Sequence, residues 1–310
     1  MADARANAER LVRKLHLWES YPFEHRFVQT PQGAMHYVDE GQGRTILALH
    51  GNPTWSYLYR RFVEGFSGTH RVVAPDHIGF GLSAKPSDER AYTIAQHIRN
   101  LEHLVVTLDL TDITLVLQDW GGPIGLGVAA RHPERVTSLV ILNTFGFYPP
   151  ADHMDPDNLK LPPPIRLMRS RALGDFLVRR LGFFERNVMP LAVADKGRYR
   201  DVRNAYTGVF EGFADRAGVA AFPRLIPTHT EHPTAKILRG ETAPFLERFT
   251  GKAQIFWGVQ DPFFPIEALH AWKKRLPDAE VTELSDAKHY IQEDKPEVII
   301  PKMRAFLARA

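Results

Sequence analysis

Short apolar runs recur along the chain from Arg44 onward, and each run ends at a turn that leads into a helical pattern. Runs of this kind are typical of strands buried in a parallel sheet. Six such strands are predicted, at residues 45–49, 71–75, 113–117, 136–142, 253–257 and 281–284. Helices are predicted at residues 2–14, 56–66, 94–108, 123–131, 265–275 and 296–309. The alternation predicts an α/β fold with a parallel sheet and helices on both of its faces.

The alternation stops between residues 147 and 233, where strand-like runs are absent and proline-rich turns appear. Helical patterns fill this segment, for example at residues 165–180 and 197–211. Ligands bind at the carboxyl edge of open α/β sheets, so a helical insertion here predicts a cap over that edge. The sequence therefore predicts a core domain of residues 1–146 and 234–310 and a helical cap domain of residues 147–233.

The third predicted strand runs directly into Gln118-Asp119-Trp120-Gly121-Gly122, after which a helix begins. A sharp turn between a strand and a helix holds one side chain clear of the sheet and directs backbone N–H groups to the same point. The glycines let the helix approach closely. Asp119 stands at the exposed position of this turn, so we predict that it is a nucleophile. Taken alone, it also fits an aspartate that merely caps the following helix.

The segment His50-Gly51-Asn52-Pro53 follows the first strand of the repeating pattern, where an oxyanion-binding loop is expected in such a sheet. The backbone N–H groups of Asn52 and Trp120 are the expected pair of oxyanion donors. The side-chain amide of Asn52 can also donate a hydrogen bond into the same cavity. For His50 we expect a structural position, packed beneath the turn.

A base and an acid are predicted near the ends of the last two strands. His289 lies between the last strand and the last helix, a position that distinguishes it from the other histidines of the chain. Asp261 follows the strand at 253–257 and is the predicted partner that orients His289, although a turn aspartate is the structural alternative. The other strand end that suits an acid holds Asn143, which cannot ionise, and Asp286 is expected in a loop.

One glycine-rich segment, Gly79-Phe80-Gly81-Leu82-Ser83-Ala84, matches the G-x-G-x-x-A pattern of dinucleotide-binding loops. Such a loop must open a helix within a strand–helix–strand unit. Lys85-Pro86 follows and ends any helix there, so we interpret the segment as a loop. No spacing of His, Asp or Glu residues indicates a metal site, and no cofactor is expected.

Composition narrows the classes of partner. The formal net charge is only +3 and the basic residues are scattered, so nucleic-acid binding is not expected. No apolar run is long enough to span a membrane and residues 1–14 do not form a secretory signal, so no membrane partner is expected. The chain has no cysteine, which excludes a cysteine nucleophile and thiolate metal sites and fits a cytoplasmic protein.

Several motifs together resemble the haloalkane dehalogenases. They are His50-Gly51-Asn52-Pro53-Thr54-Trp55-Ser56-Tyr57-Leu58-Tyr59-Arg60, Asp76-His77-Ile78-Gly79-Phe80-Gly81-Leu82-Ser83, Gln118-Asp119-Trp120-Gly121-Gly122, Trp257-Gly258-Val259-Gln260-Asp261 and His289. The resemblance covers most of the core, and in the cap it is carried chiefly by residues 222–227. It implies an α/β-hydrolase fold, with a mostly parallel central sheet flanked by helices and an inserted helical cap.

Two positions distinguish this sequence from the epoxide hydrolases, which share the aspartate nucleophile. Epoxide hydrolases usually carry an aromatic residue where Asn52 stands and a histidine where Gln118 stands. None of the five tryptophans lies in the predicted cap, so a cap tryptophan cannot donate to a halide. With Asp261 as the acid, the sequence resembles the branch that combines an Asp-His-Asp triad with an Asn-Trp halide-binding pair, here Asn52 and Trp120.

The resemblance implies hydrolytic dehalogenation of haloalkanes to an alcohol and a halide. Asp119 would form a covalent alkyl ester while Asn52 and Trp120 bind the departing halide. His289, held by Asp261, would activate the water that hydrolyses the ester. The expected partners are a small apolar halogenated substrate, water and a halide ion, and the oligomeric state cannot be read from the sequence.

Two alternatives stay open. An epoxide hydrolase would use the same nucleophile with cap tyrosines as acids, for which Tyr148, Tyr199 and Tyr206 are available. A non-catalytic binding protein would use the capped pocket for a ligand only. The candidates for an apolar pocket lining, each of which fits the hydrophobic core better, are Phe145, Phe147, Phe210, Phe213 and Phe222.

Overall fold

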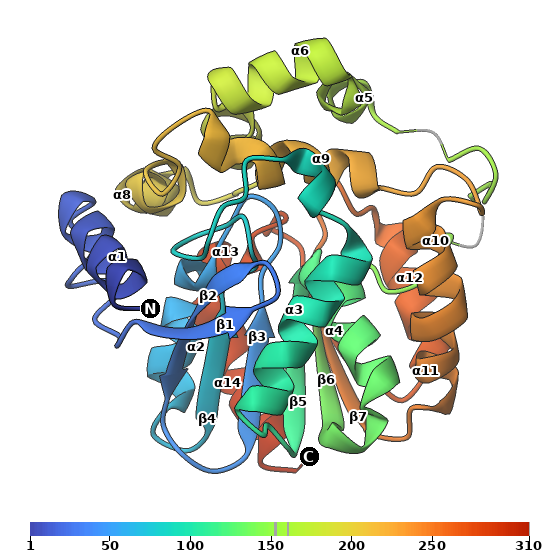
Figure 1. Cartoon of the computed structure of the whole chain (residues 1–310). Coiled ribbons are helices and arrows are strands. Elements are labelled where there is room, and N and C mark those ends of the chain that lie inside the picture. Colours follow the sequence, from blue (N-terminus) through green and yellow to red (C-terminus); the bar gives the residue numbers. More distant parts are fainter. Residues whose placement is uncertain (152–153, 160, 310) are drawn as a thin grey trace.

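The computed structural model of the chain describes residues 1–151, 154–159 and 161–309 (Figure 1). Its centre is one sheet of eight strands in the order β1-β2-β4-β3-β5-β6-β7-β8. The strands are β1 (Arg26–Thr30), β2 (Gly33–Glu40), β3 (Thr45–Leu49), β4 (Arg71–Pro75), β5 (Ile113–Asp119), β6 (Val136–Thr144), β7 (Lys252–Gly258) and β8 (Glu280–Leu284). From β4 to β8, neighbouring strands pair in parallel, so their carboxyl ends meet at one edge.

The amino-terminal edge of the sheet departs from the prediction. β1 and β2 form an antiparallel hairpin, and β2 also pairs antiparallel with β4. The pattern of apolar residues does not predict these strands, because Arg, Gln, His and Asp side chains interrupt their apolar positions. By contrast, β3 and β5 are buried at every position, as expected of parallel strands covered on both faces.

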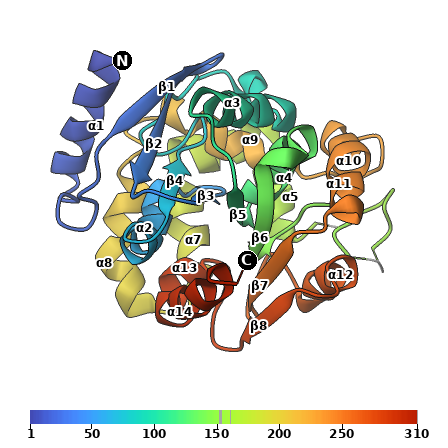
Figure 2. The same cartoon turned by 90° about the horizontal axis from the view of Figure 1, so that it is seen from below.

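Helices cover both faces of the sheet. Those outside the β6–β7 connection are α1 (Ala2–Lys14), α2 (Arg60–Phe66), α3 (Ile94–Thr107), α4 (Gly121–Arg131), α12 (Ile266–Arg275), α13 (Ile291–Asp294) and α14 (Pro296–Leu307). Seen from below, α2 and α14 lie on one face of the sheet, and α3, α4 and α12 lie on the other (Figure 2). This arrangement is the predicted α/β-hydrolase architecture.

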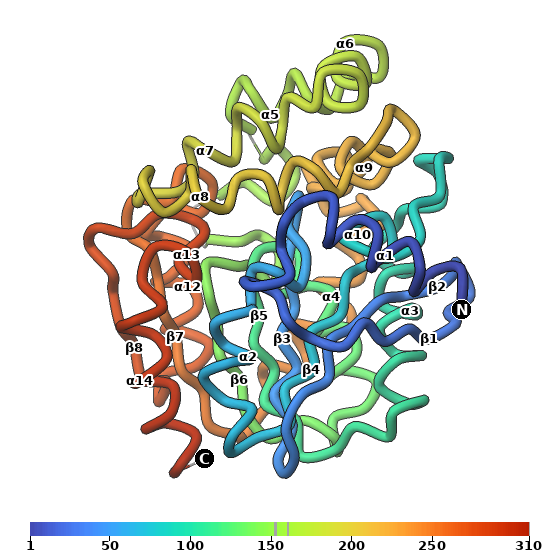
Figure 3. Tube along the Cα trace, turned by 90° about the vertical axis from the view of Figure 1, so that its left-hand side faces the viewer, coloured from blue at the N-terminus to red at the C-terminus, as the bar shows by residue number. Residues whose placement is uncertain are grey.

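The connection between β6 and β7 is helical. It contains α5 (Pro163–Arg169), α6 (Arg171–Asp175), the π-helical turns η4 (Phe176–Arg180) and η5 (Phe184–Val188), α7 (Met189–Leu191), α8 (Lys196–Thr207), α9 (Ala217–Leu225), α10 (Pro233–Ile237) and α11 (Ala243–Arg248). Figures 1 and 3 show α9 above the carboxyl edge of the sheet, with α5 and α6 outermost. The last two helices instead lie beside the core, and α11 packs against α4. The predicted division at residues 147 and 233 stays a prediction.

Two predicted cap helices differ in extent from those observed. The helix predicted at residues 165–180 is broken at Ser170, whose backbone is extended. The Ser170 hydroxyl accepts a hydrogen bond from the Gly174 N–H and so caps a second helix, a role that serine favours over a helix interior. The helix predicted at residues 197–211 ends at Thr207, just before Gly208.

Candidate active site

The turn after β5 carries Asp119 in a strained backbone conformation. β5 ends at Asp119, α4 begins at Gly121, and Asp119 has a φ of 48°, in the left-handed region. For a residue other than glycine this conformation costs about 1–2 kcal/mol, and such strain is found where surrounding structure holds it in place. The Thr144 hydroxyl donates to the Asp119 carbonyl oxygen. A side chain at Gly121 would collide with the Leu49 carbonyl, so glycine permits the close approach of α4.

The Asp119 carboxylate meets the loop that follows β3. The Asn52 backbone N–H donates to Asp119 Oδ2 at 2.8 Å, and a Cβ atom at Gly51 would collide with that same oxygen. Burial raises the pKa of Asp119 to about 6, against the opposing influence of His289 and of the Asn52 and Trp120 backbone N–H groups. The carboxylate is therefore held by N–H donors while its environment is largely dry.

His289 and Asp261 form a buried pair. His289 Nδ1 lies 2.8 Å from Asp261 Oδ2, and the backbone N–H groups of Phe263 and Phe264 donate to Asp261 Oδ1 at 2.7 and 3.1 Å. Burial alone would lower the pKa of His289, but the neighbouring carboxylates, chiefly Asp261 and then Asp119, together outweigh burial and raise it. With Nδ1–H directed at Asp261, the neutral ring presents the Nε2 lone pair on its other side.

Asn143 supports this pair although it cannot ionise. Its side-chain N–H donates to Asp261 Oδ2 at 2.8 Å, and its side-chain oxygen accepts the Gly258 N–H at 2.7 Å. Asn143 also has a positive φ, of 39°, at the end of β6. Asn143, at the alternative acid position, thus orients Asp261, which follows the neighbouring strand β7. The sequence pattern does not predict this contact.

Gln118 is a second contact that the sequence analysis does not predict. Its side-chain Nε2 lies 2.9 Å from His289 Nε2, and both side chains are buried. Because Nδ1 of the neutral ring carries the proton, Gln118 donates to the His289 Nε2 lone pair. The Gln118 Oε1 atom is buried without a hydrogen-bond partner. The sequence signals at Gln118 are its place directly before Asp119 and its difference from the histidine that is usual in epoxide hydrolases.

One cavity of about 360 Å³ joins these groups. All five predicted site residues line it, namely Asn52, Asp119, Trp120, Asp261 and His289. The rest of its wall is mostly apolar and comes from the loops after β6 and β7 and from the cap. These lining residues are Phe145, Tyr148, Pro150, Met154, Leu159, Leu161, Pro162, Ile165, Phe184, Pro223, Ile226, Pro227, Pro262, Phe263, Phe264, Pro265 and Ala268.

Of the five phenylalanines considered for the lining, only Phe145 reaches the cavity. Phe147 packs against Trp272, Phe222 packs against Trp120 from behind the wall, and Phe210 is buried. Phe213 is exposed. Phe184 of η5 and Phe263 and Phe264 of the loop after β7 line the cavity in their place.

The three cap tyrosines considered as acids are not gathered at the cavity. Only Tyr148 lines it, and its hydroxyl donates to the Pro156 carbonyl. The Tyr199 hydroxyl donates to the Glu185 carbonyl, and the Tyr206 hydroxyl donates to the Glu293 carboxylate.

The remaining motif residues are structural. His50 is buried beneath its turn, where its Nε2 accepts the His77 N–H at 2.9 Å. The segment from Gly79 to Ala84 is a series of turns, as predicted. The buried Asp76 carboxylate holds that segment by accepting the Leu82 N–H at 2.7 Å. Asp286 lies in a turn and pairs with Lys295 at the surface.

Comparison with known proteins supports the resemblance of the motifs. The crystal structure of the haloalkane dehalogenase DatA from Agrobacterium tumefaciens C58 matches with a TM-score of 0.81 at 27% identity, over 92% of this chain and 96% of that chain. The haloalkane dehalogenase 2 of Mycobacterium tuberculosis is 37% identical over 280 residues, which cover 90% of this chain and 93% of that protein.

A second kind of relative is equally similar. A cis-3-alkyl-4-alkyloxetan-2-one decarboxylase of Shewanella oneidensis is 37% identical over 289 residues, which cover 92% of this chain and 89% of that protein. The family of the alpha/beta hydrolase fold matches residues 44–296. The chain therefore belongs to the α/β-hydrolase fold family, in the group that contains the haloalkane dehalogenases and their close relatives.

Proposed function

We propose that the protein hydrolyses haloalkanes to an alcohol and a halide through a covalent ester on Asp119. The observation that carries this proposal is a carboxylate on a strained turn, in a mostly apolar cavity that it shares with a histidine–aspartate pair. A carboxylate needs no base in order to attack, and it suits displacement at a saturated carbon. Above its pKa of about 6, Asp119 is ionised and ready to react.

In the first step, an Asp119 oxygen forms a bond to the halogen-bearing carbon, and the halide leaves with the bonding electron pair. A departing halide needs hydrogen-bond donors rather than a proton. The Asn52 side-chain amide and the Trp120 indole N–H, both on residues that line the cavity, are the proposed donors. The product of this step is an alkyl ester of Asp119.

In the second step, rotation of the Gln118 amide frees His289 Nε2, which removes a proton from water. The resulting hydroxide attacks the carbonyl carbon of the Asp119 ester. The Asn52 and Trp120 backbone N–H groups stabilise the oxyanion, consistent with the hydrogen bond that Asn52 already donates to Oδ2. The alcohol leaves with the proton from His289, and the second proton of the water is released as Asp119 becomes a carboxylate again. Asp261 stabilises the charged histidine throughout.

An epoxide hydrolase is less well supported. An alkoxide leaving group requires acids, and the tyrosines considered for that role donate their hydroxyl hydrogens to Pro156, Glu185 and Glu293. The discriminating positions, Asn52 and Gln118, also differ from the residues usual in epoxide hydrolases.

Decarboxylation of a cis-dialkyl oxetan-2-one is the second candidate, because the relative from Shewanella oneidensis is as similar as the dehalogenases. The same nucleophile accounts for it with balanced chemistry. Asp119 attacks the saturated ring carbon that bears oxygen, the ring carboxylate leaves, and CO₂ and the Asp119 carboxylate are then expelled to form an alkene. This route consumes no water.

A panel of three substrates of similar size distinguishes these activities. The purified protein is incubated with a bromohexane, an epoxyhexane and a cis-dialkyl oxetan-2-one, and bromide, diol and alkene are each measured. We expect bromide and hexanol, with Asp119→Asn as an inactive control. Alkene from the oxetanone without bromide release would replace the proposal with the second candidate, and diol alone would replace it with an epoxide hydrolase.

A further inference from the structure

The outermost helices of the molecule expose apolar side chains. Ten large hydrophobic side chains are exposed among the described residues, and four of them fall within residues 167–181. These four are Leu167, Leu173, Phe176 and Leu181, with exposed fractions of 41–53%. Figures 1 and 3 place α5 and α6 on the outside of the cap, and no described element lies beyond them.

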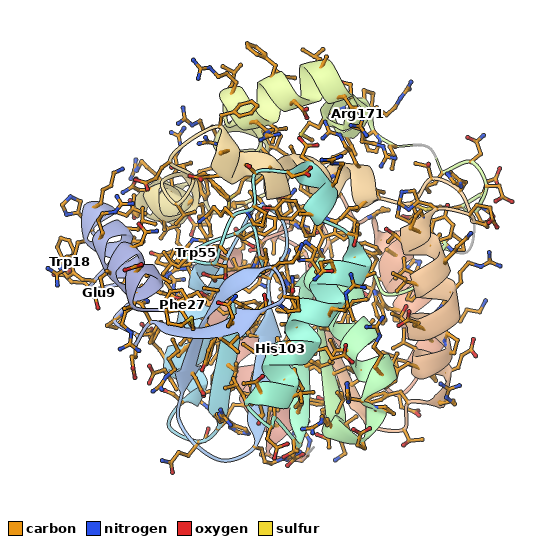
Figure 4. All side chains as sticks on the ribbon, in the orientation of Figure 1. Glu9, Trp18, Phe27, Trp55, His103 and Arg171 are labelled. Carbon is orange, nitrogen blue, oxygen red and sulfur yellow. The ribbon has the colours of Figure 1, made fainter. Side chains whose placement is uncertain are left out.

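The exposed charges on the same surface are all positive. Between residues 161 and 191, the exposed charged side chains are Arg166, Arg171, Arg180 and Arg186. The two carboxylates of this stretch, Asp175 and Glu185, are paired with Arg224 and Arg216 respectively. Figure 4 shows Arg171 on this outer layer. We call the surface formed by Arg166, Leu167, Arg171, Leu173, Phe176, Arg180 and Leu181 the outer cap face.

The direction of these helices is fixed by contacts on their inner side. Met168 and Val178 are fully buried beneath them. Arg169 donates to the carbonyl oxygens of Pro223 and Ile226, and Arg179 pairs with Glu89 at 3.0 Å. Leu173 of α6 and Phe176 and Arg180 of the π-helical turn η4 are all exposed, so the side opposite these inner contacts faces solvent. The exposure of these apolar side chains therefore follows from how α5, α6 and η4 pack against the residues beneath them.

We propose that the outer cap face binds the surface of a lipid bilayer with anionic headgroups. Leu and Phe side chains enter the boundary between headgroups and acyl chains, while the flanking arginines pair with the phosphates. A second copy of this chain fits less well, because a two-fold contact would bring the arginines of both copies against one another. The sequence predicts no membrane partner because no apolar run is long enough to span a bilayer, and no helix of the described residues could cross one. A contact with the bilayer surface requires no spanning segment.

The position of the outer cap face also suits delivery of substrate, a point that rests on the proposed function. Leu161, Pro162 and Ile165 line the cavity, and the next two residues of α5, Arg166 and Leu167, belong to the outer cap face. Haloalkanes and dialkyl oxetanones are apolar and concentrate in lipid. A cap resting on a bilayer therefore brings the cavity wall close to the phase in which such substrates collect.

Vesicle sedimentation of the full-length protein tests the binding without any substrate. Vesicles of phosphatidylcholine alone are compared with vesicles of equal parts phosphatidylcholine and phosphatidylglycerol, at low salt and at roughly 0.5 M NaCl. We expect binding only to the anionic vesicles, and weaker binding at high salt. Leu173→Ser with Phe176→Ser, and separately Arg166→Gln with Arg171→Gln and Arg180→Gln, should each weaken binding roughly tenfold or more.

The matched control is Arg239→Gln with Arg248→Gln, which removes exposed arginines from residues 238–248, a segment outside the outer cap face that packs against α4, and should leave binding unchanged. Failure to bind anionic vesicles would overturn the proposal, as would equal loss of binding in the control. Concentration-dependent dimerisation that Leu173→Ser with Phe176→Ser abolishes would also overturn it, in favour of a second copy as the occupant. Because no substrate is present, these outcomes do not depend on which reaction the protein catalyses.

Discussion

As the proposed nucleophile, Asp119 meets two opposing requirements. A nucleophile in a dry cavity reacts well because little water must be removed from it, but burial also opposes its ionisation. The structure moderates this conflict with the Asn52 and Trp120 backbone N–H groups and the neighbouring His289, which lower the pKa of Asp119 while burial raises it to about 6. The sequence predicted the identity of this residue and the turn that carries it, but not this balance, which depends on distances between segments remote in the chain.

The cost of the buried charge predicts that Asp119→Asn stabilises the fold. Folding raises the pKa of this carboxyl from 3.8 to about 6, so the protonated form is favoured in the folded state. The resulting penalty is absent below about pH 4, develops as the pH rises toward 6, and is complete above it. At pH 8 the free energy of unfolding of the variant should exceed that of the wild type by roughly 1–3 kcal/mol, measured by urea denaturation. A variant that is less stable at pH 8 would contradict this interpretation.

We expect the contact with Gln118 to change the pKa of His289. When His289 Nε2 gains a proton, the Gln118 amide must rotate and present Oε1, which has no other partner. Hydrogen bonds to a charged group are about twice as strong as neutral ones, so Gln118 favours the charged ring overall. Gln118→Met should therefore lower the pKa of His289 by roughly one unit, measured by NMR of labelled histidine. The other histidine resonances provide the internal reference, and an unchanged His289 titration would refute the role.

At the scale of elements, one junction connects the β6–β7 connection to the segment that carries His289. The Ala192 carbonyl accepts the His289 N–H at 3.0 Å, and the Asp294 carboxylate accepts the Ala194 and Lys288 N–H groups. On α8, Tyr206 donates to Glu293 of α13, whose carboxylate also binds Arg60 in two hydrogen bonds. Apolar periodicity cannot predict such a junction, because its residues come from four separate segments.

A pair of tyrosine variants tests this junction. Tyr206→Phe removes a buried hydrogen bond to an ionised carboxylate and should lower the free energy of unfolding by about 1.5–3 kcal/mol. The matched control, Tyr199→Phe on the same helix, removes a 3.3 Å bond to a neutral carbonyl and should cost roughly 0.5–1.5 kcal/mol. Equal losses in urea denaturation would show that the ionised partner contributes nothing to the attachment of α8.

The elements themselves were predictable to different degrees. The six parallel strands and their helices follow from apolar runs. Burial on both faces requires such runs in the inner strands, whereas β8 lies at the edge of the sheet and is only partly buried. β1 and β2 lack such runs because they form an antiparallel edge. The break at Ser170 depends on a hydrogen bond to Gly174 rather than on a helix-breaking residue.

In the site, the five predicted residues meet at one cavity, whereas Asn143 and Gln118 act through contacts that only the folded chain reveals.

At the scale of the whole molecule, the proposed reaction predicts an acidic limit to activity. The first step requires ionised Asp119, so kcat/KM should fall as the pH drops below about 6, approaching a tenfold loss per pH unit. Initial rates of bromide release at low substrate concentration, taken between pH 4.5 and 8 at intervals of roughly 0.5 pH unit, measure this fall in kcat/KM. A profile that stays flat down to pH 4.5 would conflict with a nucleophile in the observed environment.

The alkyl ester on Asp119 is the central claim, and intact-protein mass spectrometry of His289→Gln tests it most directly. This variant retains the nucleophile and the proposed halide donors but lacks the base that activates water. After incubation with a bromohexane, its mass should increase by one hexyl group, with release of one bromide per chain, and peptide mapping should locate the addition at Asp119. Turnover by His289→Gln without any adduct, or an adduct that persists in Asp119→Asn, would contradict the account.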